Sequence, residues 1–232
     1  AYFLWGFLPL YMKALAHVPP VEVIAHRVLW SVPVAGVVLV ATGRTADLAR
    51  AFRTPRTLAM AVLTALLISV NWGIYGSGHA LDAALGYYIN PLFSVLVGWA
   101  VLRERLAPAQ WLAIVLALAA VAILTWEAGR LPMVALGLTL TWGAYAFFKK
   151  WLPIGPNQGF MLEVLILAPF ALGYVLWLAR TGQSHFLQGV SFDTGMLLGC
   201  GLVTAVPLIL YANGAKGLRL STIGIMQYIA PT

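Results

Sequence analysis

Two ionisable side chains, Arg27 and Glu163, lie inside long apolar runs of the sequence. Charged groups within such runs are costly to bury, and they usually face a cavity, a partner or a solute pathway. Each also lies near enough to the end of its run to extend toward water, which is the structural alternative. We interpret both as pathway and gate or coupling candidates. Asp82 is the best nearby partner for Arg27, and Lys149 or Lys150 for Glu163.

A proline in mid-run marks a second candidate position. Asn90-Pro91 lies near the middle of an apolar stretch. Proline removes a backbone donor and clashes with the preceding turn, and in lipid the freed carbonyl needs a partner or a wet cavity. We expect a kinked or broken helix here, with Asn90 and Pro91 lining a central cavity and Tyr87 and Tyr88 forming an aromatic wall. A simple packing bend and ordinary core tyrosines are the alternatives.

Two tryptophans complete the set of candidate pathway residues. Trp5 precedes Gly6 and Trp142 precedes Gly143, within two similar stretches of sequence. Tryptophan near a membrane interface is common, so a cavity-lining role and an interfacial role both remain open. The glycines favour close approach of neighbouring helices.

The composition excludes an ordinary water-soluble domain. Of 232 residues, 62% are hydrophobic and 9% are charged, against about 25% charged in soluble domains. The apolar runs are continuous rather than alternating, which favours membrane-spanning helices over a transmembrane β-barrel. The single cysteine, Cys200, allows no intrachain disulfide and no cysteine-based metal site. We expect no cofactor, no metal ion and no catalytic centre.

The runs predict an all-α polytopic protein with about nine spans and very short connections. A short basic amphipathic helix over 43–56 is expected to lie on the inner leaflet. The chain begins and stops within apolar stretches, so we interpret both ends as truncated. The expected spans are 2–16, 21–42, 57–78, 81–102, 108–126, 131–148, 158–179, 194–214 and one that begins near 221.

The net charge of +7 is interpreted as topology information rather than as a nucleic-acid footprint. Lysines and arginines collect in cytoplasmic loops. The bias places the N-terminus and the loops that follow even-numbered spans in the cytoplasm. It also predicts that Lys149 and Lys150 anchor a helix end at the lipid headgroups. Three basic residues lie at the ends of odd-numbered spans, namely Lys13, Arg130 and Arg180. Ten follow the even-numbered spans: Arg44, Arg50, Arg53, Arg56, Arg103, Arg105, Lys149, Lys150, Lys216 and Arg219.

Two motifs recur along the chain. Phe3-Leu4-Trp5-Gly6 is matched by Leu140-Thr141-Trp142-Gly143, and Tyr88-Ile89-Asn90-Pro91 by Tyr228-Ile229-Ala230-Pro231. These matches predict two five-helix repeats, 1–126 and 131–232, with the second C-terminally truncated. Because five is odd, the second repeat would enter the membrane from the opposite side, as in inverted-repeat transporters. Ten helices are expected in full, and about nine here.

Six stretches of the sequence match the motifs of one protein family: Phe3–Tyr11, Glu22–Ser31, Gly86–Leu92, Leu102–Trp111, Leu218–Gly224 and Gln227–Thr232. They resemble RarD-type permeases of the EamA family, in the drug/metabolite transporter superfamily. The resemblance implies a ten-helix permease of two five-helix halves. The stretch from Asn71 to Gly78 is about one helical turn shorter than the family pattern.

We expect a secondary transporter that moves a small organic solute or drug-like metabolite across the bacterial cytoplasmic membrane by alternating access. The partners expected are membrane lipid, the solute and, as a candidate coupling ion, the proton, with no nucleic acid. The sequence has no Walker motif, so ATP is not the expected energy source. A membrane receptor or sensor is one alternative. An intramembrane hydrolase using Ser77 and His79 is a weaker one, because residues two apart on a helix face different directions.

Overall fold

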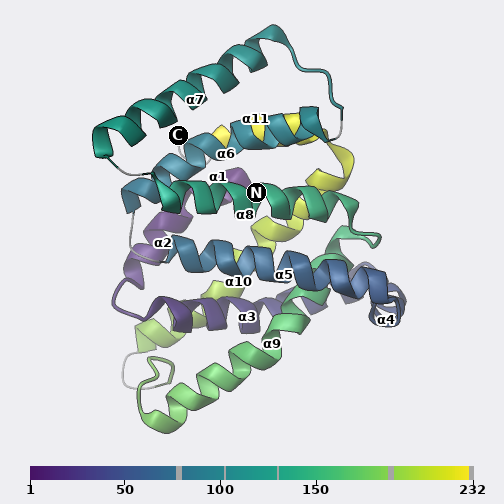
Figure 1. Cartoon of the computed structure of the whole chain (residues 1–232). Helices are drawn as coiled ribbons and strands as arrows, with labels where there is room; N and C mark the ends of the chain where they lie inside the picture. Colours follow the sequence, from purple (N-terminus) through teal and green to yellow (C-terminus); the bar gives the residue numbers. More distant parts are fainter. Residues whose placement is uncertain (77–79, 102, 130, 188–190, 230–232) are drawn as a thin grey trace.

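The computed structural model describes residues 1–76, 80–101, 103–129, 131–187 and 191–229, and every regular element within them is helical (Figure 1). Each expected span has a helical counterpart. A short 3₁₀ turn, Gln227–Ile229, follows the last helix. The helices are α1 (Tyr2–Gly6), α2 (Leu8–Ala14), α3 (Pro20–Ala41), α4 (Thr45–Phe52), α5 (Pro55–Tyr75), α6 (Ala80–Ala100), α7 (Pro108–Ala128), α8 (Met133–Trp151), α9 (Pro156–Thr181), α10 (Ser191–Gly217) and α11 (Leu220–Met226).

Prolines set the starts of several long helices. Pro20, Pro55, Pro108 and Pro156 are the first residues of α3, α5, α7 and α9. Proline suits this position because the first helical N–H has no partner within the helix and the ring fixes a helical φ. Five helices of the described residues, α3, α5, α7, α9 and α10, are long and apolar enough to cross a membrane.

The first expected span is two helices rather than one. The structure ends α1 at Gly6 and starts α2 at Leu8, with Phe7 between them. Pro9 explains the difference, because its ring clashes with the carbonyl of Trp5, four residues earlier, and its nitrogen donates no hydrogen bond.

Helix α6 is continuous from Ala80 to Ala100, so it is not broken at Pro91, and the alternative of a kink there stays a prediction. A neighbouring side chain supplies a donor close to the proline. The Tyr228 hydroxyl donates to the carbonyl oxygen of Tyr88 at 3.2 Å, in the turn before Pro91. The carbonyl that Pro91 leaves without an intrahelical donor is that of Tyr87, four residues earlier, so the bond from Tyr228 lies beside the proline and does not replace the lost one.

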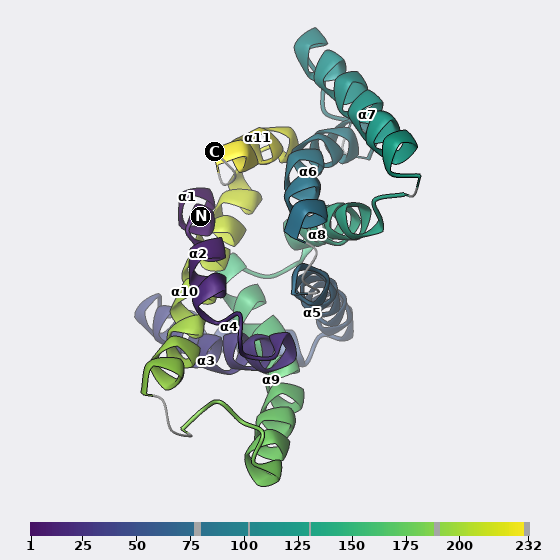
Figure 2. The same ribbon diagram turned by 90° about the vertical axis from the view of Figure 1, so that its left-hand side faces the viewer.

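The helices pack as neighbours in a layered bundle (Figures 1 and 2). Helix α3 packs against α9 and α10, α8 lies against α5 and α6, and α11 lies on α6. Helix α7 packs chiefly on α6 and stands at the edge of the molecule (Figure 2). The main buried core joins α1, α3, α5, α8, α9, α10 and α11.

The two ends of the bundle are distinguished by α4. Helix α4 lies at one end, together with the start of α5 and the starts of α7 and α11 (Figure 1). We call this the α4 end, and the other the opposite end. The short helix expected over 43–56 is present as α4, where Ala51 packs against Leu152 and Leu162.

Candidate functional site

A buried ion pair lies between α8 and α9. The Lys149 Nζ is 2.8 Å from the Glu163 Oε1, and the exposed fractions of the two side chains are 1% and 2%. The Tyr145 hydroxyl donates to the other carboxylate oxygen at 3.3 Å. Both oxygens of Glu163 therefore have donors, as a buried carboxylate requires.

The pairing confirms Lys149 as the partner of Glu163 and corrects the expectation that Lys149 anchors at the headgroups. Trp142, Tyr145 and Lys149 recur at three- and four-residue spacing on α8, so they share one helix face. All three are buried, which turns that face toward the protein core. The neighbouring Lys150 donates instead to the backbone carbonyl oxygens of Ala215 and Leu218.

Five rings from three helices form what we call the aromatic cluster: Tyr2 and Trp5 of α1, Trp142 and Tyr145 of α8, and Tyr211 of α10. The Trp5 and Trp142 rings meet edge to face with centroids 5.1 Å apart. Tyr211 lies 5.2 Å from Trp142 and 6.5 Å from Tyr145. Its buried hydroxyl has no hydrogen-bond partner, so the cluster holds an unsatisfied polar group among apolar faces.

Arg27 lies in a separate polar contact on α3. Its guanidinium carbon is 4.2 Å from the ring centroid of Trp72 on α5, and its Nε donates to the Thr204 hydroxyl on α10 at 2.9 Å. The Glu163 oxygens accept hydrogen bonds from Lys149 and Tyr145. Glu163 and Arg27 therefore have different partners, as expected for two separate charged sites. The side chain of Asp82, the expected partner, lies outside the described residues.

The structure separates the residues around Pro91. Asn90 is 4% exposed and its Oδ1 has no hydrogen-bond partner. The Pro91 carbonyl faces α11, where a Cβ added to Gly224 would lie 2.7 Å from it. Tyr88 is half exposed and lies outside the aromatic cluster. The side chain of Tyr87 lies outside the described residues.

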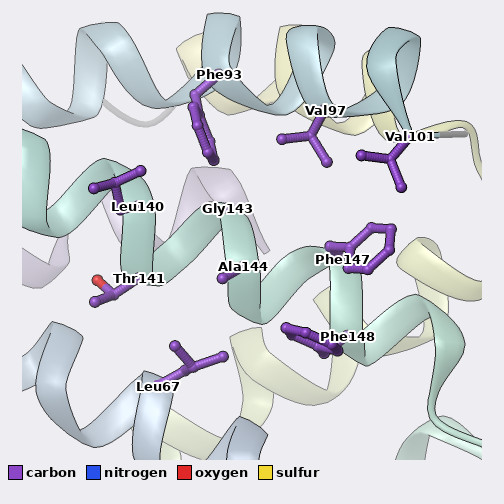
Figure 3. A pocket seen from close by; sticks show the side chains of 10 residues that line it. All are labelled: Leu67, Phe93, Val97, Val101, Leu140, Thr141, Gly143, Ala144, Phe147 and Phe148. Carbon is purple, nitrogen blue, oxygen red and sulfur yellow. The ribbon is translucent and has the colours of Figure 1, made fainter.

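A hollow of about 430 Å³ lies along α8, between α5 and α6 (Figure 3). Phe93 and Val97 of α6 and Val101, the residue after its end, project into it, and Leu67 faces α8 from α5 (Figure 3). Gly143 leaves room for the Phe93 ring, which a Cβ at that position would meet at 2.3 Å. The lining suits a hydrocarbon group. It includes none of the expected pathway residues whose side chains the structure describes.

The model of the EamA-like transporter family matches residues 1–126. The chain belongs to the EamA family. Its fold is therefore that of an all-α, multi-pass membrane protein, and the chain is a member of a family of membrane transporters.

Curated EamA relatives match along the whole chain. "Protein RarD" of Streptomyces exfoliatus is 41% identical over 235 residues, covering 100% of this chain and 75% of that protein. "Protein RarD" of Escherichia coli is 36% identical, covering 100% and 80%. An "Uncharacterized transporter" of Vibrio cholerae is 39% identical, covering 100% and 78%. A solved crystal structure shares the fold, with a TM-score of 0.70 at 19% identity over 98% of this chain and 80% of the other.

Sequence reasoning overlooked several residues that contact the candidates. Tyr145 could have been found from its position on one α8 face with Trp142 and Lys149. Tyr211, Trp72 and Thr204 carried no local signal, because they meet their partners only through packing of helices distant in sequence. Ser77 and His79, the hydrolase candidates, lie outside the described residues. Within the described residues, no group of three metal-ligating side chains is found.

Proposed function

We propose that this EamA-family transporter moves a small organic solute across the bacterial cytoplasmic membrane by alternating access, and that the Lys149–Glu163 pair couples this movement to protons. The observation that carries the proposal is the buried ion pair joined through Tyr145 to the aromatic cluster. Ionisable groups inside a membrane bundle are costly, and they serve solute or proton pathways.

The aromatic cluster supports the proposal that the solute is planar or weakly cationic. Tyrosine and tryptophan rings present large apolar faces with a negative quadrupole, which stack on planar groups and attract cations. The partnerless hydroxyl of Tyr211 supplies one polar contact within reach of the rings. This combination favours a drug-like or aromatic metabolite over a sugar, which needs many hydrogen-bonding groups.

The chemistry of the pair supports the proposed proton coupling. A proton taken up by Glu163 removes the negative charge that holds Lys149 beside it, so protonation weakens the contact between α8 and α9. A proton that binds one conformation better than the other shifts the population of the two. Solute bound beside Tyr145 would feel the same change, because Tyr145 donates to Glu163.

The test is flux in proteoliposomes with and without an imposed pH gradient, screened over planar organic solutes. Glu163→Gln should abolish the dependence of flux on the gradient while leaving passive exchange of the solute. Glu127→Gln is the matched control, since Glu127 is an exposed carboxylate on α7, and it should behave as wild type. Gradient dependence that survives in Glu163→Gln would reject the coupling role.

A second variant guards against misfolding, because Glu163→Gln leaves the Lys149 ammonium buried without its counter-ion. The double variant Lys149→Met, Glu163→Met replaces the pair by apolar side chains of similar size, which buried ion pairs commonly tolerate. It should fold and should also lack gradient dependence. A folded double variant that still follows the gradient would contradict the proposal.

The orientation proposed is with the N-terminus and the α4 end in the cytoplasm, supported by the excess of lysine and arginine in the loops at that end. Gln183 and Thr54 are exposed in loops beyond α9 and α4. In a Cys200→Ser background, Gln183→Cys should react with an impermeant thiol reagent in intact cells and Thr54→Cys should not. The reverse pattern would invert the topology.

A further inference from the structure

Helices α3 and α9 begin in the same way. Each has proline as its first residue, Pro20 or Pro156, and a polar residue two positions later, Glu22 or Gln158. The exposed fractions of Glu22 and Gln158 are 0% and 1%. Polar side chains buried this completely require partners.

Glu22 holds the segment that follows α9. Its Oε1 accepts from the Ser184 hydroxyl at 3.2 Å and from the His185 backbone N–H at 2.8 Å. Its Oε2 is 2.8 Å from the His185 Nδ1. Beside this contact, His17 and Asp193 are 3.0 Å apart and join the segment before α3 to the start of α10. The start of α3 is therefore fastened to the segment just past the end of α9.

Gln158 holds the helix that follows α3. Its Nε2 donates to the Asp47 Oδ2 on α4 at 3.3 Å. Its Oε1 folds back over Gly155, where an added Cβ would lie 2.2 Å away, and has no hydrogen-bond partner. The start of α9 is thus fastened to the segment just past the end of α3.

These contacts form a reciprocal pair. Helices α3 and α9 pack together and run in opposite directions (Figure 1). The first turn of each helix is hydrogen-bonded to the segment that follows the other helix in sequence. One contact lies at the α4 end and the other at the opposite end. If the two helices belong to the two repeats, parting of the repeats at one end breaks one contact and spares the other.

We propose that Glu22 and Gln158 are positioning residues of two matched gates, which set the balance between the two access states of the transporter. The Glu22 gate consists of Glu22, Ser184 and His185, and the Gln158 gate of Gln158 and Asp47. This inference rests on the alternating access proposed above. The Glu22 gate has three polar contacts to a carboxylate and the Gln158 gate has one. The bonds in both gates go to a carboxylate and are charge-assisted, so the larger number of bonds makes the Glu22 gate the stronger of the two.

The native Cys200 reports on the Glu22 gate. It is fully buried in a small cluster with Leu15, Val18, Val23 and Leu197, and Val23 directly follows Glu22 in the sequence. The rate of its alkylation by a water-soluble maleimide would be measured in lipid nanodiscs, where both ends of the protein meet water. Glu22→Gln should raise this rate at least tenfold. Gln158→Met should leave it unchanged or lower it.

A second reporter covers the α4 end. In a Cys200→Ser background, Ala51→Cys places a thiol on the buried face of α4 against Leu152 and Leu162. Its alkylation should accelerate in Gln158→Met and stay unchanged or slow in Glu22→Gln. His185→Ala weakens the Glu22 gate from its surface side and keeps the buried carboxylate, so it should also raise the alkylation rate of Cys200. This variant replaces Glu22→Gln in the test if Glu22→Gln fails to fold.

The crossed pattern separates gating from loss of structure. Both reporters accelerating together in one variant would indicate general loosening and would overturn the proposal, as would unchanged rates in Glu22→Gln and His185→Ala. Labelling does not depend on flux. Crossed labelling without flux of any solute would leave the gates standing and refute the proposed function, whereas flux without crossed labelling would do the reverse.

Discussion

Trp5 and Trp142 pack edge to face with ring centroids 5.1 Å apart, although more than half of the chain separates them in sequence. Each precedes a glycine in one of two similar stretches. The contact joins α1 to α8 and places a ring from each proposed repeat in the aromatic cluster. It is the structural feature on which a shared binding surface between two halves can be built.

Trp142 should contribute far more to stability than a lipid-facing tryptophan. It is 9% exposed and contacts three other rings, whereas Trp126 on α7 is 88% exposed. Trp142→Ala should lower the free energy of unfolding by about 3–5 kcal/mol, the usual range for a buried aromatic truncation. Trp126→Ala should change it by less than about 0.5 kcal/mol. Reversible unfolding in mixed micelles measures both, and equal effects would contradict the burial argument.

Asn90→Ala should reduce transport more than it reduces stability. The Asn90 Oδ1 is buried without a hydrogen-bond partner, so removing it sacrifices no bond to that atom. We expect flux to fall at least tenfold with a melting temperature within a few degrees of wild type. Tyr88→Phe, at a half-exposed position on the same helix, is the control and should transport normally. Normal flux in Asn90→Ala would exclude Asn90 from the pathway.

Gly201→Ala should force α3 and α10 apart. A Cβ at Gly201 would lie 2.2 Å from the Trp30 carbonyl oxygen, which is backbone and cannot rotate away. Overpacking of this kind costs about 1–3 kcal/mol or more. Gly195→Ala on the same helix meets nothing within 4 Å and should be neutral or stabilising by about 0.5–1 kcal/mol. Comparison of their melting temperatures decides the point, and a stable Gly201→Ala would be inconsistent with this close approach.

The contact between Glu104 and α11 should weaken in acid. The Glu104 carboxylate accepts hydrogen bonds from the backbone N–H groups of Leu220 and Ser221 at 2.9 and 3.1 Å. Burial alone would raise the pKa of this carboxyl, but hydrogen bonds from Ser221 and Leu220 outweigh it and hold the pKa below its usual 4.5. A lowered pKa contributes stability that is present above the ordinary value and is lost as pH falls through the lowered one.

The measurement compares melting temperatures of wild type and Glu104→Gln between pH 3 and pH 7. Wild type should be the more stable above pH 4.5, and the difference should shrink as the pH falls through the lowered value. A difference that stays constant over the whole range would mean that the charge of Glu104 makes no contribution to the contact with α11.

The local features of the chain followed from sequence. Runs of apolar residues long enough for a bilayer, bounded by Pro20, Pro108 and Pro156, located the helices, because hydropathy and proline act within a few residues. The same local reasoning expected a kinked or broken helix at Pro91, where α6 is unbroken and a kink stays a prediction. The Tyr228 hydroxyl, which reaches the Tyr88 carbonyl from an element distant in sequence, is invisible to any local pattern.

Which buried polar groups meet was decided only by the tertiary structure. The sequence indicated that Glu163 and Arg27 are buried charges, but not that Tyr145 joins Glu163 to an aromatic cluster, nor that Trp72 covers Arg27. Such contacts depend on the rotation of each helix about its axis and on which helices become neighbours. Both are fixed by side-chain packing summed over the whole bundle, whereas the positions of the spans are fixed by each segment's own affinity for lipid.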